Sequence, residues 1–196
     1  MEHAYSNKQP WIRPTDPAQI RIIDDFLPDY DYTQSSYSNW WNLPTNYPQY
    51  KEHGFIGTNV KSSDIPHMQR VEAGINHACR VLALPALDHI TTHVLLVSEY
   101  GSSFETNIHV DDTSPWQWGY TFSYHWLGAE GSGGTVFYDD LQGSNELHRV
   151  EFRPNRLAVF PASYPHTGYA HPDQPNQGRR VLLSTFTVLA GTGPNI

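Results

Sequence analysis

Two side chains in one short stretch are spaced as metal ligands. His109 and Asp111 stand two positions apart in NIHVDD, residues 107–112, and a second His-x-Asp triplet, HPD, occupies residues 171–173. Residues at positions i and i+2 of a β-strand project to the same face. If NIHVD is a strand, His109 and Asp111 therefore point toward one common partner. The second triplet fails this test, because HPDQPNQG carries prolines and a glycine that disfavour a regular strand.

A complete site needs a third ligand from farther along the chain. Two imidazoles and one carboxylate on one face of a metal leave positions open, an arrangement typical of non-haem iron centres. His166 is the best candidate, because it follows RLAVFPASYPH, a predicted strand and turn, about 55 residues after Asp111. His125, His148 and His171 are the alternatives.

Two adjacent arginines are candidates for holding an anion. Arg179 and Arg180 open the last apolar stretch, GRRVLLSTF. The planar fork of arginine suits two-pronged binding of a carboxylate. Side chains alternate along a strand, so only one of the two arginines points inward, where it needs an anion as partner.

Composition favours a single soluble domain. The chain has 196 residues, 38% of them hydrophobic, a net charge of −8 and one cysteine, Cys79. No run of basic residues suggests nucleic-acid binding, and no stretch is apolar enough to span a bilayer. One cysteine excludes an internal disulfide, and the N-terminus lacks a secretory signal pattern. We expect a cytoplasmic protein without nucleic-acid or membrane partners, whose oligomeric state the sequence leaves open.

The elements that must position the ligands are mostly strands. From His89 onward the hydrophobic period is two, with turn residues in nearly every gap. The predicted strands cover residues 92–100, 105–111, 119–127, 133–139, 148–152, 156–160, 166–170 and 179–189. Eight short strands of this kind are typical of a sandwich, a barrel or a jelly roll.

The N-terminal third is expected to add a strand and helices. Residues 20–28 predict a short strand, residues 29–40 a weak helix, and residues 37–50 an aromatic loop. The strongest helix covers residues 64–84, where apolar side chains recur at spacings of three and four and Pro85 follows. The expected fold is therefore mainly β with α, with N-terminal helices packed on the outside of one sheet.

The order of these motifs resembles a known enzyme family. IDDFLP, YGSSFETNIHVD, GGTVFY, NRLAVFPASYPH and GRRVLLSTF follow one another as in Fe(II)/2-oxoglutarate-dependent dioxygenases, most closely the prolyl 4-hydroxylase-like branch. The resemblance covers roughly residues 20–28 and 90–189. It implies a double-stranded β-helix (jelly roll) with the iron inside. Residues 1–196 would then form one oxygenase domain, with an N-terminal region, 1–88, and a jelly-roll core, 89–190.

The resemblance also implies roles for individual residues. His109, Asp111 and His166 would bind Fe(II), and Arg180 would hold the distal carboxylate of 2-oxoglutarate, with Arg179 as the runner-up. The loop YAHPDQPNQG makes the gap between His166 and the arginines longer than expected, which leaves that choice open.

Further cosubstrate contacts follow from the same resemblance. Tyr100 matches the tyrosine that precedes the His-x-Asp motif in the family, although it also fits a core position of its strand. Ser184 would add a hydroxyl near 2-oxoglutarate. Tyr124 and Trp126 occupy the strand on which another cosubstrate contact usually lies.

The implied reaction is hydroxylation coupled to oxidative decarboxylation of 2-oxoglutarate to succinate and CO2. O2 is the second cosubstrate, and ascorbate is an optional addition. Halogenating relatives carry a small residue in place of Asp111, so the aspartate favours hydroxylation. The expected substrate is peptidyl and prolyl-like, or a small amino acid or metabolite.

Two other functions fit parts of the same pattern. One is a non-enzymatic cupin-like jelly roll that binds a metal or a small molecule, which would not need Arg180. The other is a zinc hydrolase with the same three ligands, which usually needs a separate general base. Glu105 is the nearest acid for that role.

Overall fold

The computed structural model describes residues 16–30, 55–60, 66–84, 87–98, 107–111, 119–170 and 180–189. Most of these residues lie in strands. The elements are η1 (Pro17–Gln19), β1 (Arg21–Ile23), β2 (Phe55–Val60), α2 (Pro66–Val81), β3 (Leu87–Ser98), β4 (Tyr120–Leu127), β5 (Gly133–Tyr138), β6 (Glu146–Glu151), β7 (Arg156–Pro161), β8 (His166–Ala170) and β9 (Arg180–Leu189). None of the helices in these ranges combines the length and the apolar composition that a membrane span requires.

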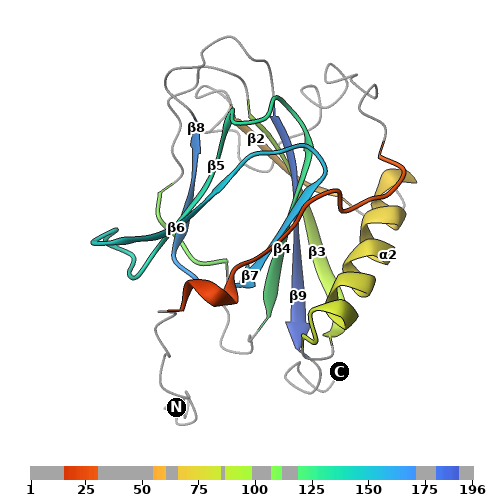
Figure 1. The fold of residues 1–196 in the computed structure, drawn as a ribbon, viewed down its shortest axis with the longest axis horizontal. Coiled ribbons are helices and arrows are strands. Elements are labelled where there is room, and N and C mark those ends of the chain that lie inside the picture. Colours follow the sequence, from red (N-terminus) through yellow and green to blue (C-terminus); the bar gives the residue numbers. More distant parts are fainter. Residues whose placement is uncertain are drawn as a thin grey trace, which may run out of the picture.

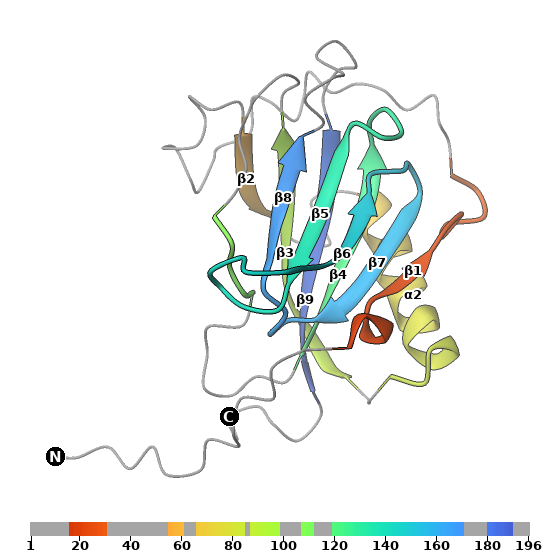
Figure 2. The same cartoon turned by 60° about the vertical axis from the view of Figure 1, so that its left-hand side comes forward.

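The strands form two antiparallel sheets (Figure 1). The larger sheet has six strands in the order β1-β7-β4-β9-β3-β2, and the smaller has three in the order β6-β5-β8. Figure 2 shows the smaller sheet lying across β4, β7 and β9 of the larger one. Neighbours in the sheets are mostly distant in sequence, which is how residues far apart along the chain come together.

Helix α2 covers the opposite face of the larger sheet (Figures 1 and 2). Its apolar stripe, Val71, Ile75 and Ala78, recurs at spacings of four and three and is almost completely buried. The stripe belongs to a core cluster with side chains of β4 and β7, namely Phe122, Tyr124, Trp126, Leu157 and Val159. This cluster defines the helix-facing side of β4 and β7.

The alternate residues of the same two strands face the smaller sheet. Ala158 and Phe160 of β7 form a second core cluster with Phe137 and Val150, which come from β5 and β6. In the register of β4 and β7, Thr121 lies opposite Phe160. Directly opposed residues share a face of the sheet, so the odd-numbered residues of β4 point between the two sheets.

The predicted elements are confirmed over much of this region, with four differences. The strong helix and the strands from 119 onward are present, with ends shifted by a few residues. The strand predicted for residues 20–28 is limited to β1, because a left-handed turn at Asp25 interrupts it. Strand β2 was not predicted at all. Of the weak helix predicted for 29–40, only residues 29 and 30 are described, and they are not helical.

The fourth difference concerns the metal-binding motif itself. Residues 105 and 106 lie outside the described ranges, and residues 107–111 form no strand, only an isolated β-bridge between His109 and His166. The prediction of a strand over 105–111 is therefore wrong for its described part. The two ligands are brought together by a local bend instead of by strand alternation.

Candidate metal centre

Backbone hydrogen bonds connect the segment that carries His109 and Asp111 to Ala162, just before β8, and to His166, the first residue of β8. His109 and His166 exchange two backbone hydrogen bonds, each 2.9 Å long, and Asp111 N donates to Ala162 O at 2.9 Å. These bonds align two segments that lie more than 50 positions apart in the sequence. The backbone pairing thus sets the relative positions of all three candidate ligands.

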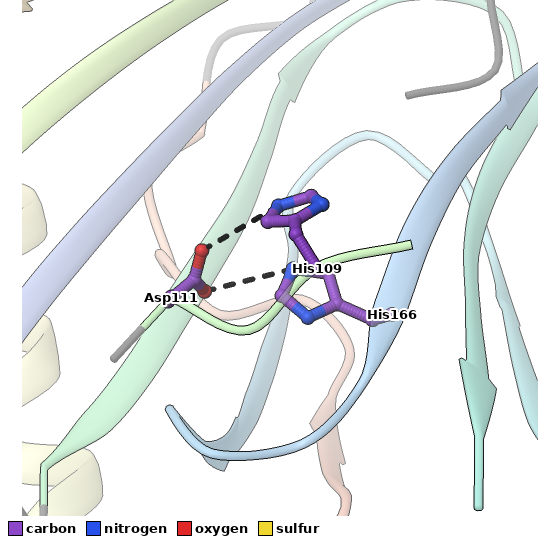
Figure 3. Close-up of side chains that lie close together, drawn as sticks. All are labelled: His109, Asp111 and His166. Carbon is purple, nitrogen blue, oxygen red and sulfur yellow. Dashed lines mark ion pairs between the residues drawn. The ribbon is translucent and has the colours of Figure 1, made fainter. Parts of the chain in front are cut away.

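The three side chains converge on one point (Figure 3). One potential ligand atom from each of His109, Asp111 and His166 lies within 4.8 Å of the others. Asp111 Oδ1 is 3.7 Å from His109 Nε2, and Asp111 Oδ2 is 3.6 Å from His166 Nε2. These separations exceed a hydrogen bond, and they leave space for an ion that contacts all three groups.

Backbone carbonyls orient both imidazole rings. His109 Nδ1 lies 2.7 Å from Asn107 O, and His166 Nδ1 lies 2.9 Å from Tyr164 O. A carbonyl oxygen can only accept, so each Nδ1 carries the proton. In the neutral form of each ring, Nε2 then presents its lone pair toward Asp111, which is how metal-binding histidines are usually fixed.

His166 sits in an apolar, aromatic environment. Its side chain is 9% exposed, and the rings of Phe160 and Phe137 lie 5.0 and 5.9 Å from its own. Burial lowers the pKa of His166, and the nearby Asp111 carboxylate opposes this effect only in part. The ring is therefore neutral at neutral pH, the form that binds a metal.

The centre is open on one side. The side chain of His109 is 44% exposed, whereas that of Asp111 is 10% exposed. Asp111 also accepts a hydrogen bond on Oδ2 from Thr121 Oγ1 at 2.6 Å. A ligand or substrate can therefore approach past His109, while the aspartate is enclosed and held from β4.

The donor set matches a known class of metal centre. Two imidazoles and one carboxylate on a single face leave coordination positions free, as in non-haem Fe(II) oxygenases. The same donors also bind Zn(II). The residues present therefore fit a ferrous ion without excluding zinc.

The structure describes only part of the predicted 2-oxoglutarate site. Arg180 is the first residue of β9 and pairs with Ser98 of β3. Ser184 lies opposite Ser123 of β4, two residues along the strand from Thr121. Arg179 and Tyr100 lie outside the described residues.

Tyr124 and Trp126 are not brought to the centre. Both are buried in the core cluster beneath α2, at 0% and 4% exposure. Side chains alternate along β4, so this placement is on the face opposite to Thr121. Thr121 is the residue of this strand that contacts the candidate site, and its role was not predicted.

Other histidines of the sequence lie elsewhere. His125 is fully buried, stacks on Phe152 at 4.8 Å, and accepts a hydrogen bond from Arg153 N at Nδ1. His148 lies on β6, and His171 is outside the described residues. In the described part of the chain, His109, Asp111 and His166 form the single cluster suited to a metal.

Fold and cluster together define a two-sheet β protein with a candidate metal centre of the two-histidine, one-carboxylate type. Solved structures with a similar fold include non-haem, 2-oxoglutarate-dependent enzymes and prolyl hydroxylases. No protein-family model and no curated protein matches the sequence.

Three of these structures span most of the chain. The non-haem α-ketoglutarate-dependent epimerase SnoN from nogalamycin biosynthesis aligns over 88% of this chain and 78% of its own, with a TM-score of 0.62 and 13% identity. A prolyl hydroxylase from Trichoplax adhaerens, solved with a hypoxia-inducible-factor peptide, aligns over 90% and 86%, with a TM-score of 0.56 and 15% identity. A Pseudomonas putida prolyl-4-hydroxylase aligns over 87% and 92%, with a TM-score of 0.52 and 15% identity.

Two other matches are less extensive. The match covers 63% of AviO1 from Streptomyces viridochromogenes and 64% of the carbocyclase SnoK, which is under two thirds of each chain. At identities of 12–15% these similarities show a shared fold.

Proposed function

We propose that the protein is an Fe(II)- and 2-oxoglutarate-dependent oxygenase that hydroxylates a peptidyl, prolyl-like substrate or a small amino acid or metabolite. The observation that carries this proposal is the convergence of His109, Asp111 and His166 within 4.8 Å. The fold, which is similar to that of enzymes using the same cofactors, supports it.

The candidate ligands divide the binding work between them. His109 and His166 would each bind Fe(II) through Nε2, because Nδ1 of each faces a carbonyl oxygen. Asp111 would supply one negative charge, which lowers the net charge of the loaded centre. With iron bound, O2 would be the oxidant, and 2-oxoglutarate would supply two electrons as it is oxidised to succinate and CO2, so that one oxygen atom of O2 enters succinate and the other the substrate.

The cosubstrate contacts belong to the same proposal. Arg180 at the start of β9 would pair with the distal carboxylate of 2-oxoglutarate, and Ser184 would donate a hydroxyl nearby. The pairing of β9 with β4 supports the part of Ser184, because it brings Ser184 opposite Ser123, two residues along the strand from Thr121, which contacts Asp111. Ascorbate would act as an optional reductant in the assay.

The class of substrate separates two versions of the proposal. The Trichoplax prolyl hydroxylase was solved with a peptide, and SnoN is an epimerase from nogalamycin biosynthesis. The exposed edge of His109 is compatible with both a peptide and a small molecule. We favour the peptidyl, prolyl-like substrate on the motif order of the sequence.

An anaerobic titration followed by exposure to air tests the proposal. Fe(II) and 2-oxoglutarate together should produce a weak visible charge-transfer band, and air should then yield succinate. Asp111→Ala should abolish both signals. His77→Ala is the matched control, because His77 is an exposed histidine on α2, and this variant should retain both signals.

The two remaining functions are outcomes of the same experiment. Metal binding with no charge-transfer band and no succinate would overturn the oxygenase proposal and favour a cupin-like binding protein. Zn(II)-dependent hydrolysis by the same sample would favour the hydrolase. A set of proline-containing peptides and free amino acids, scored by extra succinate release, then identifies the substrate class.

A further inference from the structure

Thr121 of β4 contacts the candidate metal centre from the larger sheet. Its Oγ1 donates a 2.6 Å hydrogen bond to Asp111 Oδ2, and the residue is 1% exposed. The bond joins a side chain near the start of a regular strand, β4, to a carboxylate on an irregular segment. A bond of this length to a charged acceptor is among the stronger hydrogen bonds in proteins.

The strand pairing explains why a threonine at this position reaches the centre. Thr121 lies opposite Phe160 of β7, and the ring of Phe160 packs edge-on against His166 at 5.0 Å. One cross-strand pair therefore contacts two of the three candidate ligands. Thr121 holds Asp111 by a hydrogen bond, and Phe160 supports His166 by packing.

We propose that Thr121 is a positioning residue that fixes Asp111 so that this carboxylate binds the metal through a single oxygen, Oδ1. The inference rests on the proposed metal centre. Oδ2 already accepts a hydrogen bond from Thr121 Oγ1, which draws on its negative charge and occupies one of its lone pairs. Oδ1, 3.7 Å from His109 Nε2, is the better donor.

Single-oxygen binding has a consequence for the reaction. A carboxylate that binds through both oxygens occupies two coordination positions, whereas one oxygen together with two imidazoles leaves three positions open. Those are the positions that a chelating 2-oxoglutarate and O2 require. Thr121 thus keeps the centre open to its cosubstrates as well as holding Asp111 in place.

The removal of one hydroxyl group tests this role. Thr121→Val has nearly the same shape but cannot donate, and it should weaken Mn(II) binding by about 10- to 100-fold, the usual effect of losing a partner of a metal ligand. Thr121→Ser keeps the donor and should bind Mn(II) within about 3-fold of the original protein, in line with the same principle. Thr135→Val makes the same change on β5 and should leave the affinity unchanged.

A second measurement reports on the coordination itself. The visible absorption spectrum of the Co(II)-loaded protein should change in Thr121→Val and be retained in Thr121→Ser. A role in packing alone predicts the reverse order, because valine preserves the shape and serine leaves a methyl-sized gap. Thermal unfolding of the metal-free variants checks that each is folded.

The outcomes separate this inference from the proposed function. If the original protein binds neither Mn(II) nor Co(II), the metal centre itself is wrong, and the role of Thr121 falls with it. If it binds both and Thr121→Val behaves identically, only the positioning role is refuted. If serine fails as fully as valine, the hydroxyl is not responsible and the inference is also overturned.

Discussion

Asn155 connects the N-terminal segment to the sheet core, and its substitution should reduce stability strongly. The side chain is enclosed, with the residue 2% exposed, and its amide forms two 2.9 Å hydrogen bonds to Leu27, accepting from N and donating to O. Its backbone carbonyl also accepts from Phe26 N at 2.9 Å. Asn155 has φ of 62°, in the left-handed region that asparagine tolerates better than alanine.

The expected cost of Asn155→Ala follows from these contacts. It leaves Leu27 N and Leu27 O without their partner in a buried position, at about 2 kcal/mol for each group. Alanine in the left-handed region adds about 1 kcal/mol. The sum, about 5 kcal/mol, is a large share of the roughly 5–15 kcal/mol that stabilise a typical domain.

Urea unfolding measures this difference in the free energy of unfolding. Asn155→Gly is the companion variant, because glycine accepts the left-handed conformation and loses only the amide contacts, so it should cost about 4 kcal/mol. A loss below about 1 kcal/mol for Asn155→Ala would refute the reasoning, since that is no more than a single ordinary hydrogen bond.

Three further predictions concern packing, pH and metal binding. Gly134→Ala should lower the free energy of unfolding by about 3 kcal/mol, measured by urea unfolding, because an added Cβ would lie 2.0 Å from the backbone oxygen of Val150. Hydrogen bonding by Arg156 lowers the pKa of Asp24 below its ordinary value of 3.8. The ionised Asp24 side chain therefore stabilises the folded protein fully above pH 3.8, and this stabilisation is lost as the pH falls through the lowered pKa. Unfolding curves of Asp24→Asn and the original protein should therefore converge in acid, and a constant difference would contradict this. Mn(II) at 100 times its dissociation constant should stabilise the protein by about 2.7 kcal/mol, and His109→Ala should show no such gain in thermal unfolding.

The regular elements were largely predictable because their signals are local. The spacing of apolar residues such as Val71, Ile75 and Cys79 predicts α2, and the structure buries Val71 and Ile75 completely and Cys79 partly. Alternation predicts β4, β5, β7 and β9 to within a few residues. Strand β2, FIGTNV, was missed because it contains a central glycine and asparagine, which are uncommon in strands.

The composition of the candidate centre was also predictable, whereas its local geometry was not. His109, Asp111 and His166 were chosen by residue type and spacing, and the structure brings them together. The strand expected around His109 is absent, because backbone bonds to His166 and Ala162 hold the segment instead. Such long-range bonds leave no periodic signal in the sequence.

The register of β4 explains the remaining difference. The stretch YTFSYHWL alternates polar and aromatic residues, so one of two faces had to be assigned to the centre. The pairing with β7 and the packing of α2 place Tyr124 and Trp126 in the helix-facing core, and Thr121 at the centre. The sequence shows that polar and aromatic residues alternate along β4. The structure was needed to tell which of the two faces points toward the candidate centre.

Crystals soaked anaerobically with Fe(II) and measured at the iron absorption edge test the central claim most directly. The account predicts one anomalous peak within bonding distance of His109 Nε2, His166 Nε2 and one oxygen of Asp111. A protein that takes up iron at another position, or that shows no peak among these three residues at saturating Fe(II), would contradict it.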